Sequence, residues 1–205
     1  MAGASELWPG WQQFGAQGKK GAEALMAEVD RIVREGGIAS PATTTRGLNA
    51  RLRYLSSPAG QEALRTHGVS PRLLRSWKAG GHPSAAKRDA VEKAYQERRR
   101  ANLIRSGALV RLLNNDGQGR RIEIYPVDQS HVLGGYSAGP GTGGRARHNV
   151  DQVRSIQGRY IWDDVVAAYA DGDVNTMDDI WLDVIQDMDS MYAAYAYVSS
   201  ISIGA

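Results

Sequence analysis

The chain has 205 residues, which is room for one or two small domains, and its formal net charge is only +3. It contains no cysteine, which excludes disulfide bonds, thiolate catalysis and cysteine-based zinc sites. Neither an apolar run of about 18 residues nor a secretory signal pattern occurs, so we expect no membrane span and no export, and we place the protein in the cytoplasm.

The small net charge conceals a strong segregation of charge along the chain. Residues 1–155 carry 24 of the 25 cations and 13 acidic residues, whereas residues 156–205 carry one arginine and nine acidic residues. The most basic part, residues 46–121, holds 17 Lys and Arg against five Asp and Glu. Such a region is typical of proteins that bind polyphosphates such as nucleic acids, although two solvated charged faces would give the same composition.

The first predicted segment, residues 1–45, is an N-terminal arm followed by one helix. Residues 1–18 are glycine-rich and hold three large aromatic side chains, which favours a hydrophobic tether over a free arm, because aromatic rings are costly to leave in water. Apolar residues recur at helical spacing over residues 20–35, and two glycines then end the helix. Residues 38–46 are polar and contain Pro41, which is typical of a linker.

The second predicted segment, residues 46–106, is a basic domain of consecutive helices. The expected helices cover about residues 44–56, 58–67, 71–79 and 85–105. Serine favours the N-cap of a helix and proline its first turn, and this signal occurs at Ser57, Ser70 and Ser84, twice with a proline next. In the longest helix, the residues that share the inward face are Ala90, Val91, Ala94 and Tyr95.

The third predicted segment, residues 107–205, is a small α+β domain, so the fold class expected for the chain is α+β. Residues 108–113 and 120–127 are interpreted as two strands around an Asp-Gly turn, with Ile122 and Ile124 on one face. A glycine-rich loop then covers residues 133–149. Its first thirteen residues include six glycines, too many for the interior of a stable helix or strand.

The rest of this domain is predicted to consist of a short strand, two acidic helices and a closing strand. The short strand covers residues 150–157, and the helices cover residues 160–170 and 176–190, the second of which Asn175 or Thr176 would cap. The tail alternates in polarity, as a strand does. The residues expected on one side of it are Tyr195, Tyr197, Ile201 and Ile203.

Residues 60–80 have the organisation of a helix-turn-helix motif. Gly68 can supply a positive φ in the turn, Val69 packs there, and Ser70 caps the second helix, whose Leu74 and Trp77 face inward. The polar residues on the outer side are free to enter a major groove, where arginine can bind guanine and lysine phosphate. These residues are Arg72, Arg75, Ser76 and Lys78.

Further basic residues are expected to contact DNA near this motif, namely Arg51, Arg53, Lys87, Arg88, Arg98, Arg99 and Arg100. Part of the last run also suits the dipole at the end of a helix. One position departs from the usual pattern, because the small residue four before the turn glycine is here Leu64, with Ala63 beside it. A helical hairpin without a DNA role is the alternative interpretation.

The glycine-rich loop contains three hydroxyl groups and two arginines that could meet phosphate. It lacks the residue order of a Walker A loop. Glycines beside a hydroxyl could present it to the active site of another protein, whereas a flexible linker is the simpler interpretation. The side chains concerned are Tyr136, Ser137, Thr142, Arg145 and Arg147.

No metal site or catalytic centre is expected. The four histidines are spread along the chain without the spacing of metal ligands. Most aspartates of residues 156–205 would lie on the wet faces of amphipathic helices, while Trp162 and Trp181 face the core. This acidic face could bind a basic partner or repel DNA.

A series of sequence blocks carries a resemblance to a known family. Basic blocks come first, TRGLNARLRYLSS, EALRTHGVSPRLLRSWKAGGHPSAAKRDAVEKAY and RRRANLIRSG, followed by RIEIYP, GGYSAGPGTGGRARHN, RYIWDDVVAAYADGD and DDIWLDVI. In this order they resemble the telomere terminal proteins of linear actinobacterial (Streptomyces-type) chromosomes and plasmids. The resemblance covers about residues 46–190. The order of the blocks is more specific than any single block, because helix-turn-helix segments are common.

The resemblance implies a DNA-binding protein that primes synthesis at recessed telomere ends. In that family a threonine hydroxyl replaces a sugar 3′-OH and becomes covalently linked to the 5′ nucleotide. The linking threonine lies just after a Gly-Tyr-Thr-Ala-Ala-Pro-Gly stretch, which here reads GYSAGPG at residues 135–141 and is followed directly by Thr142, one residue sooner than in the family. Thr142 is therefore the candidate attachment residue, with Ser137 and Tyr136 as alternatives.

The partners that the resemblance implies are telomeric DNA, as a single-stranded overhang or a duplex, a DNA polymerase and a telomere-associated protein. The chain would be a hydroxyl acceptor rather than an enzyme. It needs no cofactor of its own, because an aliphatic hydroxyl can be activated by Mg²⁺ held in the polymerase. We expect a nucleoid-associated protein without membrane contact, and a homodimer is left open.

A different class of function uses the same motif. The chain could be a plasmid- or phage-type helix-turn-helix transcriptional regulator whose acidic half mediates assembly. Such a regulator would bind an operator and form no covalent adduct with DNA. An independent nuclease or transferase is the weakest interpretation, since the sequence shows no catalytic constellation.

Overall fold

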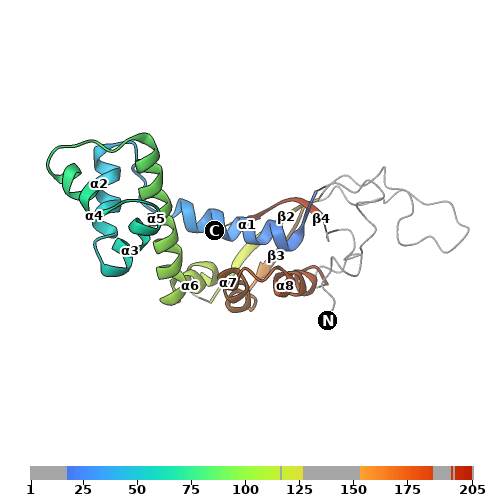
Figure 1. The fold of residues 1–205 in the computed structure, drawn as a ribbon. Helices are drawn as coiled ribbons and strands as arrows, with labels where there is room; N and C mark the ends of the chain where they lie inside the picture. Colours follow the sequence, from blue (N-terminus) through green and yellow to red (C-terminus); the bar gives the residue numbers. More distant parts are fainter. Residues whose placement is uncertain (1–17, 116, 127–152, 187–194, 196, 205) are drawn as a thin grey trace, which may run out of the picture. The chain divides into compact units, whose positions relative to one another are not determined.

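The structure is a computed structural model and describes residues 18–115, 117–126, 153–186, 195 and 197–204. These residues form eight helices and one antiparallel sheet of four strands, so the predicted α+β class is confirmed (Figure 1). None of the helices is both long enough and apolar enough to cross a membrane. The chain divides into a helical unit, residues 31–108, and a sheet unit, residues 1–30 with 109–205.

The helical unit contains the end of α1 (Gly21–Glu35) and four further helices. These are α2 (Thr45–Tyr54), α3 (Pro58–Thr66), α4 (Pro71–Lys78) and α5 (Ala85–Arg105). Each of the four begins at a hydroxyl side chain that accepts a hydrogen bond from a backbone N–H of the first turn. The caps at Ser57, Ser70 and Ser84 were predicted from the sequence, and Thr44 is a fourth.

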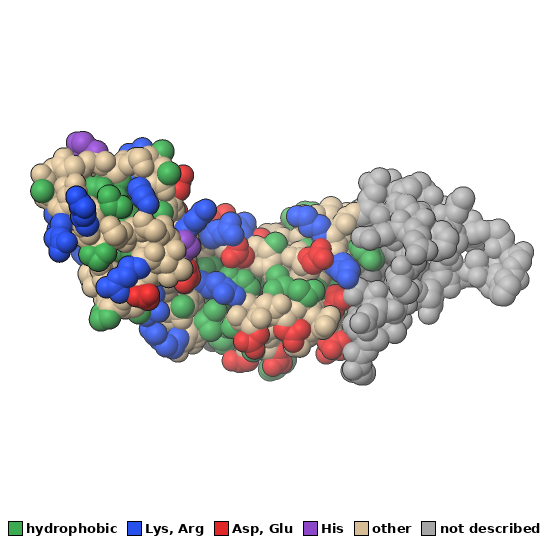
Figure 2. All heavy atoms as spheres, in the orientation of Figure 1, with side chains coloured by type: hydrophobic (Ala, Val, Ile, Leu, Met, Phe, Trp, Pro, Cys, Tyr) green, Lys and Arg blue, Asp and Glu red, His purple; other side chains and the backbone are tan. Residues whose placement is uncertain are grey.

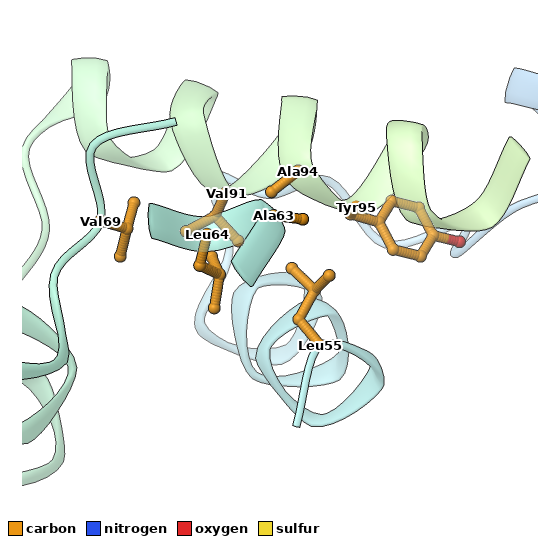
Figure 3. Close-up of a cluster of buried hydrophobic side chains, with 7 residues drawn as sticks. All are labelled: Leu55, Ala63, Leu64, Val69, Val91, Ala94 and Tyr95. Atoms are coloured by element: carbon orange, nitrogen blue, oxygen red, sulfur yellow. The ribbon is translucent and has the colours of Figure 1, made fainter. Parts of the chain in front are cut away.

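The core of the helical unit is a cluster of seven buried residues from α3, α5, the turn after α3 and the end of α2 (Figure 3). Its members are Leu55, Ala63, Leu64, Val69, Val91, Ala94 and Tyr95. The inward face predicted for α5 is confirmed, with Ala90 partly buried against the same cluster. The Oη of Tyr95 also accepts a hydrogen bond of 2.9 Å from Ile38 N, which attaches the segment before α2 to α5.

The sheet unit places helices beside one small sheet. Its strands are β1 (Lys19–Lys20), β2 (Arg120–Pro126), β3 (Arg154–Gly158) and β4 (Tyr197–Ile203), in the order β1-β4-β2-β3. Its helices, besides most of α1, are α6 (Ala108–Asn114), α7 (Trp162–Asp171) and α8 (Val174–Gln186). The carboxylate of Glu28 on α1 accepts a hydrogen bond of 2.9 Å from Ile203 N, so α1 is tied to β4.

One face of the sheet is apolar and buried, as predicted. Ile122 and Ile124 of β2 pair with Ile203 and Ile201 of β4, and all four are buried. The pairing shifts between Tyr125 and Pro126, which is a β-bulge. Because of this shift, Val198 is buried together with Tyr197, which strict alternation does not predict. Pro126 pairs with Val198, so the bulge puts Val198 on the side of Ile201 and Ile203 and moves Tyr197 to the opposite side. The prediction that Tyr197 shares a side with these two isoleucines is therefore wrong, although Tyr195 and Tyr197 are both buried.

The strand predicted at residues 108–113 is wrong, because this segment is helix α6. The preceding Gly107 has a φ of +65°, a left-handed backbone conformation that ends α5 before α6 begins. Leu109 and Leu113, one helical turn apart, are then both fully buried. A short apolar run fits a buried helix as well as a strand, so periodicity alone does not separate the two.

The cap predicted for α8 is also wrong, because Asp173 takes the place expected for Asn175 or Thr176. Its carboxylate accepts hydrogen bonds from Asn175 N at 3.0 Å and Thr176 N at 3.1 Å. The Thr176 hydroxyl donates a further bond of 2.6 Å. These bonds, the one from the hydroxyl foremost, lower the pKa of Asp173 because they favour the charged carboxylate.

Gly47 provides a test of how closely α2 packs on the segment before it. A Cβ at this position would lie 2.0 Å from the carbonyl oxygen of Pro41. Alanine normally stabilises a helix relative to glycine, but here the backbone contact cannot yield. We expect Gly47→Ala to lower the free energy of unfolding by about 2 kcal/mol, measured by urea denaturation. The control Asn49→Ala, at an exposed site of the same helix, should change it by less than about 0.5 kcal/mol; equal stability of the two variants would contradict the packing.

Candidate nucleic-acid interface

Helices α3 and α4 with the turn between them have the local geometry that a helix-turn-helix requires. Gly68 has a φ of +73°, as predicted from the sequence. Val69 is 1% exposed and its N–H donates to the carbonyl oxygen of Leu64 at 2.8 Å. The turn is therefore stabilised by a hydrogen bond to the backbone of α3 and by the buried side chain of Val69.

Leu64 occupies the position at which the motif usually has a small residue. Its side chain is fully buried, and it packs with Ala63 and Val69 in the core cluster (Figure 3). The larger side chain is thus accommodated inside the unit.

Helix α4 lies on the unit without burying any side chain completely. Leu74 and Trp77 are half-buried and pack against the core cluster, as expected. The four residues predicted to face outward, Arg72, Arg75, Ser76 and Lys78, are all exposed. Within the described part of the chain, the three cations among them have no acidic partner. Figure 2 shows Lys and Arg side chains over the helical unit, with apolar ones between them.

Arg51 does not belong to this surface, which corrects its predicted role in DNA binding. It is 5% exposed and forms an ion pair with Glu92 on α5. Its guanidinium donates to the carbonyl oxygens of Ser40 at 2.7 Å and Gly47 at 3.0 Å. The same group lies 5.2 Å from the ring centroid of Tyr95, a cation–π contact. A side chain with these partners is a structural element and cannot reach DNA.

Two other predicted DNA contacts are also engaged inside the helical unit. Lys87 donates from Nζ to the carbonyl oxygen of Gly68 at 2.6 Å, so it stabilises the turn of the motif. Arg88 donates from Nη1 to the carbonyl oxygen of Pro83 at 3.1 Å and is half-buried. These contacts follow from tertiary packing of α5 on the turn and on the loop after α4.

The run Arg98–Arg100 is partly buried, in contrast to Arg53, which is exposed. The guanidinium of Arg99 lies against Gly36 and Gly37, where the absence of side chains leaves room for it. The sequence alone does not distinguish the exposed arginines of this set from the partly buried ones. The structure leaves Arg53, together with the outward face of α4, as the exposed part of the predicted set.

The residues predicted for covalent attachment and phosphate contact lie outside the described residues. They are Tyr136, Ser137, Thr142, Arg145 and Arg147. No group of three or more His, Asp or Glu with the arrangement of a metal site occurs in the part of the chain that the structure describes.

The acidic helices α7 and α8 present most of their aspartates to solvent, as predicted, and Figure 2 shows acidic side chains over them. The exceptions are Asp178, which is 3% exposed, and Asp179, which is half-buried. Trp162 and Trp181 are buried in the core and their indole N–H groups donate to the carbonyl oxygens of Gly158 at 2.6 Å and Tyr195 at 3.0 Å. The apolar sides of these helices are therefore core, and the exposed sides are available to a partner.

Comparisons of the chain with protein-family models, curated protein sequences and solved structures found no match.

The contrast between Arg51 and Arg53 on one helix gives a direct test of the structural role. Arg51→Ala should lower the free energy of unfolding by about 3 kcal/mol, because Glu92 loses its partner and three carbonyl groups lose a donor. Arg53→Ala removes the same charge from an exposed site and should change stability by less than about 0.5 kcal/mol. Urea denaturation measures both; a stable Arg51→Ala variant with impaired DNA binding would reverse the assignment.

Proposed function

We propose that the protein is a DNA-binding terminal protein that primes end-patching of the telomeres of linear replicons. The observation that carries the DNA-binding part is the exposed basic face of α4 in a helix-turn-helix, whose cations have no acidic partner among the described residues. The priming part is supported by the sequence blocks that resemble the telomere terminal proteins. The charge segregation along the chain is consistent with both parts.

The chemistry of α4 suits duplex DNA. Arg72 and Ser76 are one helical turn apart and exposed, so they share a face that can enter a major groove. An arginine there can bind the O6 and N7 atoms of guanine with two hydrogen bonds. Each cation that neutralises a phosphate also releases counterions, so the affinity should fall steeply with salt concentration.

In the proposed priming reaction the hydroxyl oxygen of Thr142 attacks the α-phosphate of an incoming nucleotide. A P–O bond to the protein forms, the bond to the leaving pyrophosphate breaks, and a base in the DNA polymerase accepts the hydroxyl proton. The polymerase would also supply the Mg²⁺ that stabilises the developing charge. The protein is then a substrate, and the exposed acidic sides of α7 and α8 are a candidate surface for the polymerase or a telomere-associated protein.

A transcriptional regulator with an acidic assembly domain is the second candidate. The same basic face of α4 supports it, and so does the separation of the helical unit from a sheet unit with acidic helices. The two candidates differ in one outcome, because a regulator binds an operator and gains no covalent nucleotide.

The DNA-binding part can be tested with a matched pair of variants. Arg72→Ala should weaken binding to duplex DNA about tenfold at constant salt, measured by fluorescence anisotropy, because it removes one base or phosphate contact. Lys93→Ala, at an exposed site of α5, removes the same charge and should change affinity by less than about twofold. Equal losses in both variants would mean that only net charge matters, and the absence of binding by the wild-type protein would refute the function.

The priming part requires a covalent adduct. Incubation with the polymerase of the same replicon, telomeric template and labelled nucleotide should label the wild-type protein, and Thr142→Ala should abolish the label. Ser137→Ala and Tyr136→Phe serve as controls that should remain labelled. Loss of the label in one of these controls, with normal labelling of Thr142→Ala, would move the attachment site; DNA binding without any label would favour the regulator.

A further inference from the structure

A cavity of about 660 Å³ opens within the helical unit, between α2, α3, α4 and the loop that follows α4. This is within the usual range for pockets that bind small ligands, about 300 to 1,000 Å³. Helix α4, which buries no side chain completely, contributes several of its lining residues.

The inner wall of the cavity is apolar and includes an indole ring. Leu48 and Leu52 of α2 and Leu74 and Trp77 of α4 line it, and all four are half-buried. Trp77 lines the cavity and is only half-buried, so part of its indole ring is accessible to a ligand. A flat apolar ligand would find its contacts here.

The other groups at the cavity are cationic or hydrogen-bonding. Arg75, Lys78 and Arg88 line it, and none of the described residues that line it is acidic. The Nε of Arg88 is buried and has no hydrogen-bond partner among the described residues, so one donor remains unused. The exposed side chains of Thr45 and Asn49 add groups that can donate and accept.

The two faces of α4 therefore differ in their surroundings, because only one of them borders the cavity. Arg72 and Ser76 do not line the cavity, whereas Arg75 and Lys78 do. From the sequence alone, all four residues are expected on one surface that enters the major groove. The structure instead leaves the first two for a duplex and places the other two at the cavity.

We propose that this cavity binds one unpaired nucleotide, with its base on Trp77 and its phosphate between Arg75 and Lys78. The base of a nucleotide is a ring that can stack on the apolar wall, and its phosphate is an anion that the cations can bind. The polar edges of the base match the hydrogen-bonding groups of the cavity. A base within a duplex is already stacked on its neighbours and cannot enter a concave site, so the ligand is single-stranded DNA or a free nucleotide. The inference rests on the proposed nucleic-acid function and extends it from duplex to unpaired DNA.

The experiment compares two variants of the cavity with one of the outer face. Trp77→Leu keeps an apolar side chain but removes the stacking ring. Asn49→Phe partly fills the cavity from an exposed site, so it should not impair folding. Arg72→Ala is the control outside the cavity. Thermal unfolding of each variant confirms that it is folded before its binding is measured.

Binding is measured by fluorescence anisotropy with a labelled single strand of about 8 nucleotides and with a duplex, and by calorimetry with thymidine triphosphate. Both cavity variants should lose about tenfold or more in affinity for the single strand, the loss expected when one stacking contact is removed, and less than about threefold for the duplex. Arg72→Ala should show the opposite pattern. The triphosphate arm separates the two sources of ligand, since binding of it alone indicates a mononucleotide site.

Unchanged single-strand and triphosphate binding in both folded cavity variants would overturn the inference, and it would leave the proposed function intact if the duplex still binds. The direct readout is the Trp77 indole N–H signal in a nitrogen–proton NMR spectrum, assigned by its absence in Trp77→Leu. A shift of this signal on addition of either ligand is expected. A wild-type protein that binds duplex DNA while neither ligand shifts the signal would refute the cavity site alone; failure to bind any DNA refutes the proposed function separately.

Discussion

The guanidinium of Arg51 is the contact on which the helical unit depends. It joins α2 to α5 through Glu92 and holds the segment before α2 through carbonyl oxygens of Ile38 and Ser40. A buried cation is stable only when it is paired and its donors are used, and this one satisfies both conditions. Tyr95 attaches the same segment from the other side, through its contact with Ile38 N and its ring under the guanidinium. Gly47, whose carbonyl oxygen accepts from the same guanidinium, also lies close to this segment.

Helix α4 packs on the unit through half-buried side chains only. The cavity lies where α2 and α4 do not meet completely. A fully packed interface would be more stable, since empty space forfeits dispersion contacts. An incomplete interface lined by cations on one side and an indole on the other is the kind of compromise expected at a binding site, where stability is exchanged for function.

The starts of α3, α4 and α5 could be predicted because a cap is a local signal. Ser57, Ser70 and Ser84 act through hydrogen bonds to residues three positions away, so no distant contact is needed to find them. The strand predicted in place of α6 failed for the opposite reason, because burial of Leu109 and Leu113 depends on what covers them. The DNA-contact set failed in part for the same reason: Arg51 and Arg53 are two positions apart, and only packing decides which one is buried.

By itself, therefore, the sequence determined the α+β class, the helices of the basic region, the turn at Gly68 and the exposure of Arg72, Arg75, Ser76 and Lys78. These features rest on periodicity, capping and backbone conformation within a few residues. Only the tertiary structure decided which basic residues are structural, where the β-bulge buries Val198, and that Arg75 and Lys78 line a cavity with Trp77. The physical reason is that burial and pairing of a side chain are set by segments far away along the chain, which local patterns do not contain.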